Sequence, residues 1–479
     1  MKSTISFRRL TDEEFEAERQ RALSLWPTGS QIDLDEAVEY HRQIPSHKNY
    51  AKTIRDSYES GKTLVQPRGG VPILEWHIKL LRCLQDEGGA DLLPTTTDSY
   101  TRNEQFANAQ RGIDESEKAG HAMLNGLPVV CHGKDACRKV IEAVDRPIIL
   151  LSGSSMTRLT AETVLAAGYS AFLGSGIAYT ISYTKTMPIE QGIRNYQYVD
   201  RLVSYYTERG IKIHREQPGF LTGTLVPHGL GIAIAALDSL LAAEQGIKHY
   251  GVGLAQSLCL SYDIAGLKVL TKVCRHYLER YNHSDVFICP ITHQWMGAFP
   301  TDEARAYGVI CQGGVIAALS GAAAIVTKSV HEAFGVPTAE ANAAGVRVTK
   351  EMIRLLKGVR YPDSPEIQLE MSMLEDEAVA IVDKVLELGD GDPALGAVRA
   401  FEAGVLDVPW SPSQYNAHKV MPALDSNGAI RYLAAGNLPL PPHVAEYHRE
   451  KLAERGRREG REVGPDMAID DVMAVADGC

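Results

Sequence analysis

The sequence predicts a parallel α/β fold, a (β/α)8 TIM barrel with an N-terminal helical arm and a C-terminal α-rich extension. First, apolar runs alternate with amphipathic stretches from about residue 63 onward, which is typical of parallel strands joined by helices. Second, this region spans roughly 290 residues, near the usual size of such a barrel. Third, several strand-like runs end in polar residues, and a barrel collects the C-terminal ends of its strands around one mouth.

The elements follow one another in a regular order. Glycines close many of the helices, as expected at helix C-caps. Strands are expected to start near residues 63, 91, 127, 147, 169, 211, 248, 285 and 322. Helices are expected at 73–85, 103–119, 135–143, 157–167, 189–209, 228–245, 260–280 and 302–320. A barrel has only eight places for strands, so one of these candidates is an extra or a misreading.

A doubly wound open sheet is the competing fold. Such a sheet would be expected to show a glycine-rich phosphate turn early in the chain. The candidates Gly174-Ser175-Gly176 and Gly251-Val252-Gly253 are not full dinucleotide fingerprints. The barrel is therefore favoured, with an N-terminal arm at 1–60, a catalytic barrel at 61–345 and an extension at 346–479 that holds helices at 348–357, 366–388 and 443–461.

Composition excludes several classes of function. The formal charge is 49 − 60 = −11, which argues against a nucleic-acid groove, because phosphate binding needs clustered Lys and Arg. No apolar stretch approaches the ~20 residues of a membrane helix. The 8 cysteines form no Cys-x-x-Cys pair, so neither a structural zinc site nor any other metal site is predicted. Scattered cysteines without an export signal indicate a cytoplasmic protein.

Two arginines are candidates for binding a carboxylate. Arg68 follows a strand-like run and precedes Gly69 and Gly70, which would let a ligand approach the backbone. Arg102 follows the next strand candidate. Arginine offers two parallel hydrogen bonds to a carboxylate or phosphate. Each arginine alone is more often a surface or ion-pair residue, but together they favour carboxylate binding.

Other polar residues leave more than one interpretation open. Lys328, four residues before Glu332, could form a Schiff base, donate a hydrogen bond to a cofactor or make a plain ion pair. Tyr179 and Tyr183 could both point into one pocket or simply pack together. His293 and His331 have no partner at metal-ligand spacing and are interpreted as structural histidines.

Several long motifs resemble the large, epsilon subunit of glutamate mutase, also called methylaspartate mutase. The resemblance covers nearly the whole chain, including the extension. The motifs are Gln66-Pro67-Arg68-Gly69-Gly70, Leu221-Thr222-Gly223-Thr224-Leu225-Val226-Pro227, His293-Gln294-Trp295-Met296-Gly297-Ala298-Phe299-Pro300, His331-Glu332-Ala333-Phe334-Gly335-Val336-Pro337, Glu340-Ala341-Asn342-Ala343-Ala344-Gly345 and Gly428-Ala429-Ile430-Arg431-Tyr432-Leu433.

The resemblance implies an isomerase of amino acid metabolism that binds adenosylcobalamin over the barrel mouth and converts glutamate to 3-methylaspartate by a radical route. In such enzymes the protein binds, orients and shields, while the cofactor supplies the difficult chemistry. Arg68 and Arg102 match substrate-binding arginines, and Tyr179 and Tyr183 match substrate-contacting tyrosines. The positions matching adenosylcobalamin contacts are Gly70, Asn125, Phe299, Lys328, Glu332 and Val336. Lys328 and Glu332 resemble the pair that holds the adenosine ribose, which removes most support for a Schiff base.

The resemblance also implies a partner chain. The family carries its cobalt-ligating histidine on a small cobalamin-binding subunit, within an Asp-x-His-x-x-Gly motif that this sequence lacks. A homodimer of this chain within a heterotetramer is expected.

Two substrate-binding positions depart from the family pattern. Leu151 stands where the family has its third arginine, and Leu173 stands where it has a glutamate that meets the substrate amino group. Losing both charges together indicates a substrate with an altered, masked or missing charged end. A shifted alignment, with Arg158 or another residue reaching in, is the alternative. The other functions considered are a catalytically silent homologue that binds cobalamin or its partner, and an aldolase that uses Lys328.

Overall fold

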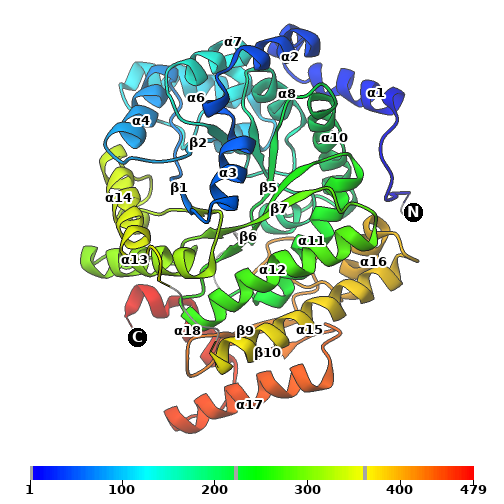
Figure 1. Ribbon diagram of the computed structural model, residues 1–479, viewed down its shortest axis with the longest axis vertical. Helices are drawn as coiled ribbons and strands as arrows, with labels where there is room; N and C mark the ends of the chain where they lie inside the picture. The colour runs from blue at the N-terminus through cyan, green and yellow to red at the C-terminus, as the bar shows by residue number, and fades with distance from the viewer. Residues whose placement is uncertain (1–3, 221–224, 360–363, 479) are drawn as a thin grey trace.

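The computed structural model of the protein describes residues 4–220, 225–359 and 364–478. Eight parallel strands form one sheet in the order β1-β8-β7-β6-β5-β4-β3-β2 (Figure 1). The strands are β1 (Leu64–Gln66), β2 (Leu93–Thr96), β3 (Ile148–Leu151), β4 (Ala171–Leu173), β5 (His214–Gln217), β6 (His249–Ala255), β7 (Phe287–His293) and β8 (Ala324–Val326).

The sheet curves into a nearly closed barrel. β1 pairs with β8, and single hydrogen bonds bring β1 and β2 together, from Asp91 N to Val65 O at 3.0 Å and from Thr96 N to Gly69 O at 2.9 Å. Burial on both faces explains why most of these strands are nearly continuous apolar runs. The exception is β5, whose four residues, His214–Gln217, are all polar or charged although they are buried. The predicted (β/α)8 barrel is confirmed.

Helices cover the outside of the barrel, one or more after each strand. α14 packs against α4, α13 and β1, so the boundary expected at residue 345 falls inside the last barrel helix. Two short helices, α5 (Ser99–Arg102) and α9 (Ala178–Tyr183), lie at strand ends. The outer helices are α4 (Leu74–Asp86), α6 (Phe106–Ala119), α7 (Val129–Glu142), α8 (Arg158–Ala166), α10 (Ile189–Glu208), α11 (His228–Glu244), α12 (Leu260–Arg280), α13 (Glu303–Ser320) and α14 (Ala339–Leu355).

The strand expected near residue 127 was wrong. Leu127 makes one hydrogen bond to the end of β2, from its N–H to Thr96 O at 2.8 Å, and the chain then enters α7. Pro128 stands just before that helix, where a residue without an N–H and with a fixed φ is well accommodated. Cys131 and His132 therefore lie on a helix and not at a strand end.

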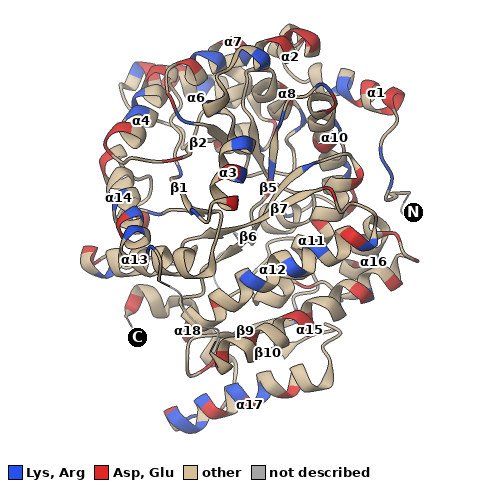
Figure 2. Ribbon diagram, viewed as in Figure 1, with Lys and Arg blue, Asp and Glu red and all other residues tan. Residues whose placement is uncertain are grey.

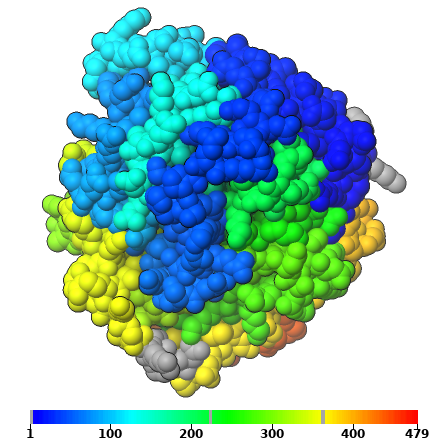
Figure 3. All heavy atoms as spheres, turned by 45° about the horizontal axis from the view of Figure 1, so that its top comes forward, coloured from blue at the N-terminus to red at the C-terminus, as the bar shows by residue number. Residues whose placement is uncertain are grey.

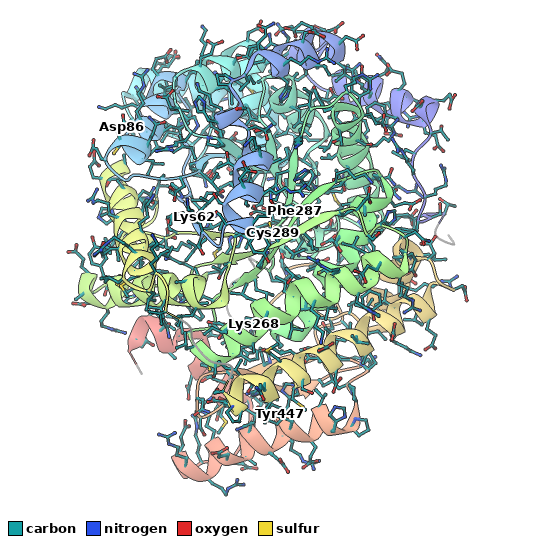
Figure 4. All side chains as sticks on the ribbon, viewed as in Figure 1. Lys62, Asp86, Lys268, Phe287, Cys289 and Tyr447 are labelled. Atoms are coloured by element: carbon teal, nitrogen blue, oxygen red, sulfur yellow. The ribbon has the colours of Figure 1, made fainter. Side chains whose placement is uncertain are left out.

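The N-terminal arm contains α1 (Asp12–Leu23), α2 (Leu34–Gln43) and α3 (Tyr50–Glu59). α3 covers the end of the barrel where the strands begin, because Tyr50 N donates to Ser170 Oγ and the Tyr50 ring stacks on His214 at 5.3 Å. Figure 3 shows this arm spread over one face, and Figure 4 labels Phe287 and Cys289 on β7 beside α3.

The extension packs on the α11 and α12 side of the barrel. Besides helices it contains an antiparallel hairpin, which the sequence analysis missed although Ser426-Asn427-Gly428 is a turn signal. Its elements are α15 (Pro365–Leu388), α16 (Pro393–Ala403), β9 (Val420–Leu424), β10 (Ile430–Ala435), α17 (Pro442–Glu459) and α18 (Pro465–Asp477).

Figure 2 shows acidic and basic residues interspersed on outer helices such as α1, α2 and α17. Among the described residues, no helix combines the length and the apolar character needed to cross a membrane.

Candidate functional site

Two adjoining cavities lie at the C-terminal ends of the strands. The outer cavity has a volume of about 920 Å³ and opens between α4 and the loop that leads into α14. The inner pocket is much smaller and lies over the barrel interior. Arg68, Thr96 and Arg102 line both, so they form the boundary between them. A ligand in the outer cavity and one in the inner pocket would meet at these three residues.

The inner pocket collects residues from six strand ends. Leu151 and Leu173 both line it, with only 7% and 2% of their surface exposed, and they are paired in register on β3 and β4. The two leucines therefore form one continuous apolar wall. The full lining is Arg68, Thr96, Arg102, Leu151, Gly153, Leu173, Tyr179, Tyr183, His293 and Val326.

The two predicted arginines face the same pocket. Asp98 caps α5 by accepting from Tyr100 N and Thr101 N, and Arg102 ends this helix, so the turn fixes its position. Arg102 Nε donates to Thr97 O at 3.0 Å. Burial and the neighbouring charge of Arg68 lower the pKa of Arg102. The pocket lining includes no carboxylate that would neutralise the pair, so the site is suited to an anion.

Close packing at Gly153 holds Arg102 in place. A Cβ on Gly153 would lie 2.8 Å from Arg102 Cζ, and its backbone has a φ of +59°. Only glycine combines that conformation with that proximity.

Tyr179 and Tyr183 come from the short helix α9. Their rings meet edge to face with centroids 5.1 Å apart, and both residues line the pocket. Both interpretations of this pair, packing and pocket lining, therefore hold. Asp238 on α11 accepts hydrogen bonds from Ile177 N at 3.0 Å and Ala178 N at 3.3 Å, which anchors the start of α9.

His293 is a pocket residue that the sequence analysis missed. It is 3% exposed, and its Nε2 has no hydrogen-bond partner among the described residues. Burial, followed by the charges of Arg68 and Lys328, lowers its pKa to about 3. The available signal was its place at the end of a strand, the same signal that identified Arg68.

Lys328 and Glu332 form an ion pair at the mouth. Lys328 Nζ lies 2.6 Å from Glu332 Oε2 and 5.9 Å from the centroid of the Phe299 ring. Burial and Arg68 lower the pKa of Lys328 to about 8, although Glu332 raises it. The geometry shows Lys328 held in an ion pair with Glu332, the arrangement expected of the plain ion pair.

The remaining predicted cofactor residues surround the outer cavity. Gly70, Asn125, Glu332 and Val336 line it. A Cβ on Gly70 would overlap the carbonyl of Thr96, so this position requires glycine for the loops after β1 and β2 to approach. Phe334 and Val336 are 68% and 67% exposed, which is unusual for large apolar side chains on neighbouring positions. Residues 221–224 of the motif before α11 lie outside the described residues.

Comparison with known proteins identifies relatives along nearly the whole chain. Residues 44–479 match the family described as methylaspartate mutase E chain (MutE). The chain is 47% identical over 471 residues to the glutamate mutase epsilon subunit of Desulfitobacterium hafniense, covering 98% of this chain and 97% of that one. It is 46% identical over 471 residues to the protein of the same name in Treponema denticola, with the same coverage. It is 43% identical to that of Escherichia coli O157:H7 over 470 residues, 98% of this chain and 97% of the relative. The chain therefore belongs to the methylaspartate mutase E chain family.

Proposed function

We propose that this chain is the catalytic subunit of an adenosylcobalamin-dependent carbon-skeleton mutase, an isomerase acting on glutamate or on a related amino acid with an altered charged end. The observation that carries the proposal is the full-length match to glutamate mutase epsilon subunits, together with a pocket at the barrel mouth that two arginines line. Arg68 and Arg102, which face an inner pocket whose lining contains no carboxylate, would hold a substrate carboxylate.

The residues at the mouth fit the nucleoside part of adenosylcobalamin. The outer cavity of about 920 Å³ lies within the range of small-molecule and cofactor sites. Glu332 offers a carboxylate to ribose hydroxyls, and Lys328 offers donors beside it. When bound, the cofactor supplies an adenosyl radical by cobalt–carbon homolysis. The chain binds the nucleoside, orients the substrate beneath it and excludes water with the buried leucine wall.

A separate small subunit would complete the enzyme. The sequence lacks the Asp-x-His-x-x-Gly motif that ligates cobalt in the family. The exposed side chains of Phe334 and Val336 beside the cavity are suited to be covered by the cofactor or by that subunit. We expect two copies of this chain in a heterotetramer. None of the seven described cysteines forms a disulfide, which supports a cytoplasmic location.

The leucine wall is the basis for an altered substrate. A charged group facing leucine would lose a charge-assisted hydrogen bond worth about 1.5–3 kcal/mol. Leu151 and Leu173 both line the pocket, whereas Arg158 makes an ion pair with Glu18 of the N-terminal arm and is absent from the pocket lining. Free glutamate, with two carboxylates and an ammonium group, would leave charged groups facing this wall.

The first prediction tests the function itself. The chain would be mixed with a small cobalamin-binding subunit and adenosylcobalamin, and offered L-glutamate or neutral-ended analogues such as L-glutamine. We expect radical formation, measured by electron spin resonance, with an analogue but much less with glutamate. Full activity on glutamate would refute the altered pocket, and no radical with any of these compounds would refute the mutase.

The second prediction restores the two charges that the family has at positions 151 and 173. Double substitution of Leu151→Arg and Leu173→Glu should improve the kcat/KM for glutamate relative to the analogue. The single variants serve as controls, because each leaves one uncompensated charge in the wall and should gain less. Equal or poorer use of glutamate by the double variant would count against the argument.

A further inference from the structure

His293 faces the barrel interior from the end of β7. Leu173 of the inner pocket is paired in register with Glu216, which is paired in register with Gly251 of β6, so Gly251 faces the barrel interior. A Cβ on Gly251 would lie 3.1 Å from Ile291 Cγ1, so Ile291 shares that face. Side chains alternate along a strand, so His293, two residues further on, lies on the same face. His293 is paired in register with Val326 of β8, another residue of the pocket lining. The imidazole thus belongs to the wall of the inner pocket.

The imidazole is a neutral group in a pocket of cations. Arg68 and Lys328 both disfavour a charge on His293, and burial disfavours it further. A neutral imidazole has one nitrogen that donates and one that accepts a hydrogen bond. His293 therefore adds no third positive charge for an anion, and it offers a hydrogen bond to an uncharged group.

The hydrogen-bonding capacity of this ring is not met by the protein. Nε2 is buried and has no partner among the described residues, and a buried polar atom left unsatisfied costs about 1–3 kcal/mol. The leucines at positions 151 and 173 cannot supply a partner. The other hydrogen-bonding groups of the lining are the two arginines, two tyrosine hydroxyls and Thr96.

Resting on the proposed function, we infer that His293 is a specificity-determining residue that holds the substrate's uncharged end by a hydrogen bond. The substrate class is a carboxylate whose far end carries an amide, alcohol or carbonyl group. Arg68 and Arg102 hold the carboxylate, the leucine wall rejects a second charge, and His293 distinguishes a polar neutral end from a purely apolar one.

The test measures binding of two probes to the full chain by titration calorimetry, without cofactor or turnover. Glutaric acid monoamide and pentanoate share a carboxylate and a similar length, but only the monoamide has a neutral hydrogen-bonding end. The wild-type chain should bind the monoamide more tightly. His293→Leu should weaken the monoamide about tenfold and change pentanoate less than about twofold, since one hydrogen bond is lost.

Two further variants separate binding from structure. His293→Gln keeps a side chain that donates and accepts, and should retain most of the preference for the monoamide. Arg102→Met should weaken both probes alike. Equal weakening of both probes by His293→Leu, no preference in the wild-type chain, or binding of neither probe would overturn the inference. A chain that shows the His293-dependent preference but yields no radical would refute the mutase proposal alone.

Discussion

Glu216 is the only acidic residue in the eight strands, which all lie within the described residues. It faces the barrel interior, since a Cβ on Gly251 would lie 3.2 Å from its Cγ. Neither carboxylate oxygen has a hydrogen-bond partner among the described residues. Burial raises the pKa of Glu216 to about 8, so the side chain is largely neutral below that pH. Its neighbour on β4, paired in register, is Leu173.

This raised pKa predicts a pH-dependent stability. Between pH 5 and 8 the folded protein holds a proton on Glu216 that the unfolded chain has lost, so the free energy of unfolding falls as pH rises, by up to about 1.4 kcal/mol per pH unit. Glu216→Gln should remove this slope and raise stability at pH 8, as measured by urea unfolding at several pH values. Glu351→Gln, at an exposed position, is the control. An unchanged slope in Glu216→Gln would exclude a neutral Glu216.

Single residues also show how far the sequence could predict the site. Arg68, Arg102, Tyr179 and Tyr183 were expected to share a pocket, and the structure brings them together. Their roles stay predictions. His293 was interpreted as structural because sequence spacing shows only local partners, whereas its neighbours come from distant strands.

Among the elements, α9 decides where the two tyrosines lie. It is a short helix of six residues, and the carboxylate of Asp238 on α11 receives the N–H groups of Ile177 and Ala178 at its start. Short helices are marginal without tertiary support. Asp238 is therefore a positioning residue for Tyr179 and Tyr183.

Removing this anchor should loosen α9. Asp238→Ala leaves two buried N–H groups unsatisfied and should lower the free energy of unfolding by about 2 kcal/mol or more. It should also raise the KM more than it lowers kcat. Asp238→Asn keeps an acceptor and should recover much of the KM. Loss of stability with an unchanged KM would show that α9 does not depend on Asp238 for tyrosine placement.

The elements themselves were largely predictable, with instructive exceptions. Eight of the nine expected strands start within about three residues of an observed strand, because local periodicity was enough to find them. The exception is residues 127–130, which are apolar but lead into α7. A short apolar run fits a strand or a buried helix equally well, and ring closure by the other eight strands decides between them. The helix expected at 348–357 is part of α14, which begins at Ala339; the sequence also indicated a helix start at Thr338, and Thr338 is the residue that caps it.

At the scale of the whole molecule, a buried ionic cluster within the extension lies against the barrel. Arg431 on β10 donates to Asp425 at 2.7 Å and to Glu370 of α15 at 2.9 Å. Its guanidinium also lies 5.5 Å from the ring centroid of Tyr262 on the barrel helix α12. Arg431, Asp425, Glu370 and Tyr262 are all buried. Each buried charge is therefore stabilised mainly by its opposite charge in the cluster and not by water.

Breaking this cluster should therefore be costly. Arg431→Met leaves two buried carboxylates without their positively charged partner. It should lower the free energy of unfolding by about 3–5 kcal/mol, measured by urea unfolding. The triple variant Arg431→Met, Glu370→Gln, Asp425→Asn also removes the two unpaired negative charges. It should recover part of the lost free energy of unfolding. A cost below about 1 kcal/mol for Arg431→Met would mean that solvent reaches the cluster.

The sequence by itself determined the order of strands and helices in the barrel, the barrel class and the end of the barrel where a ligand is expected, because these follow from local periodicity and from the direction of parallel strands. Only the tertiary structure decided that His293 shares a pocket with Leu151 and Leu173, and that Glu216 lies beside Leu173. Which side chains meet across a barrel depends on the register and tilt of strands far apart in the chain, and no local pattern encodes them.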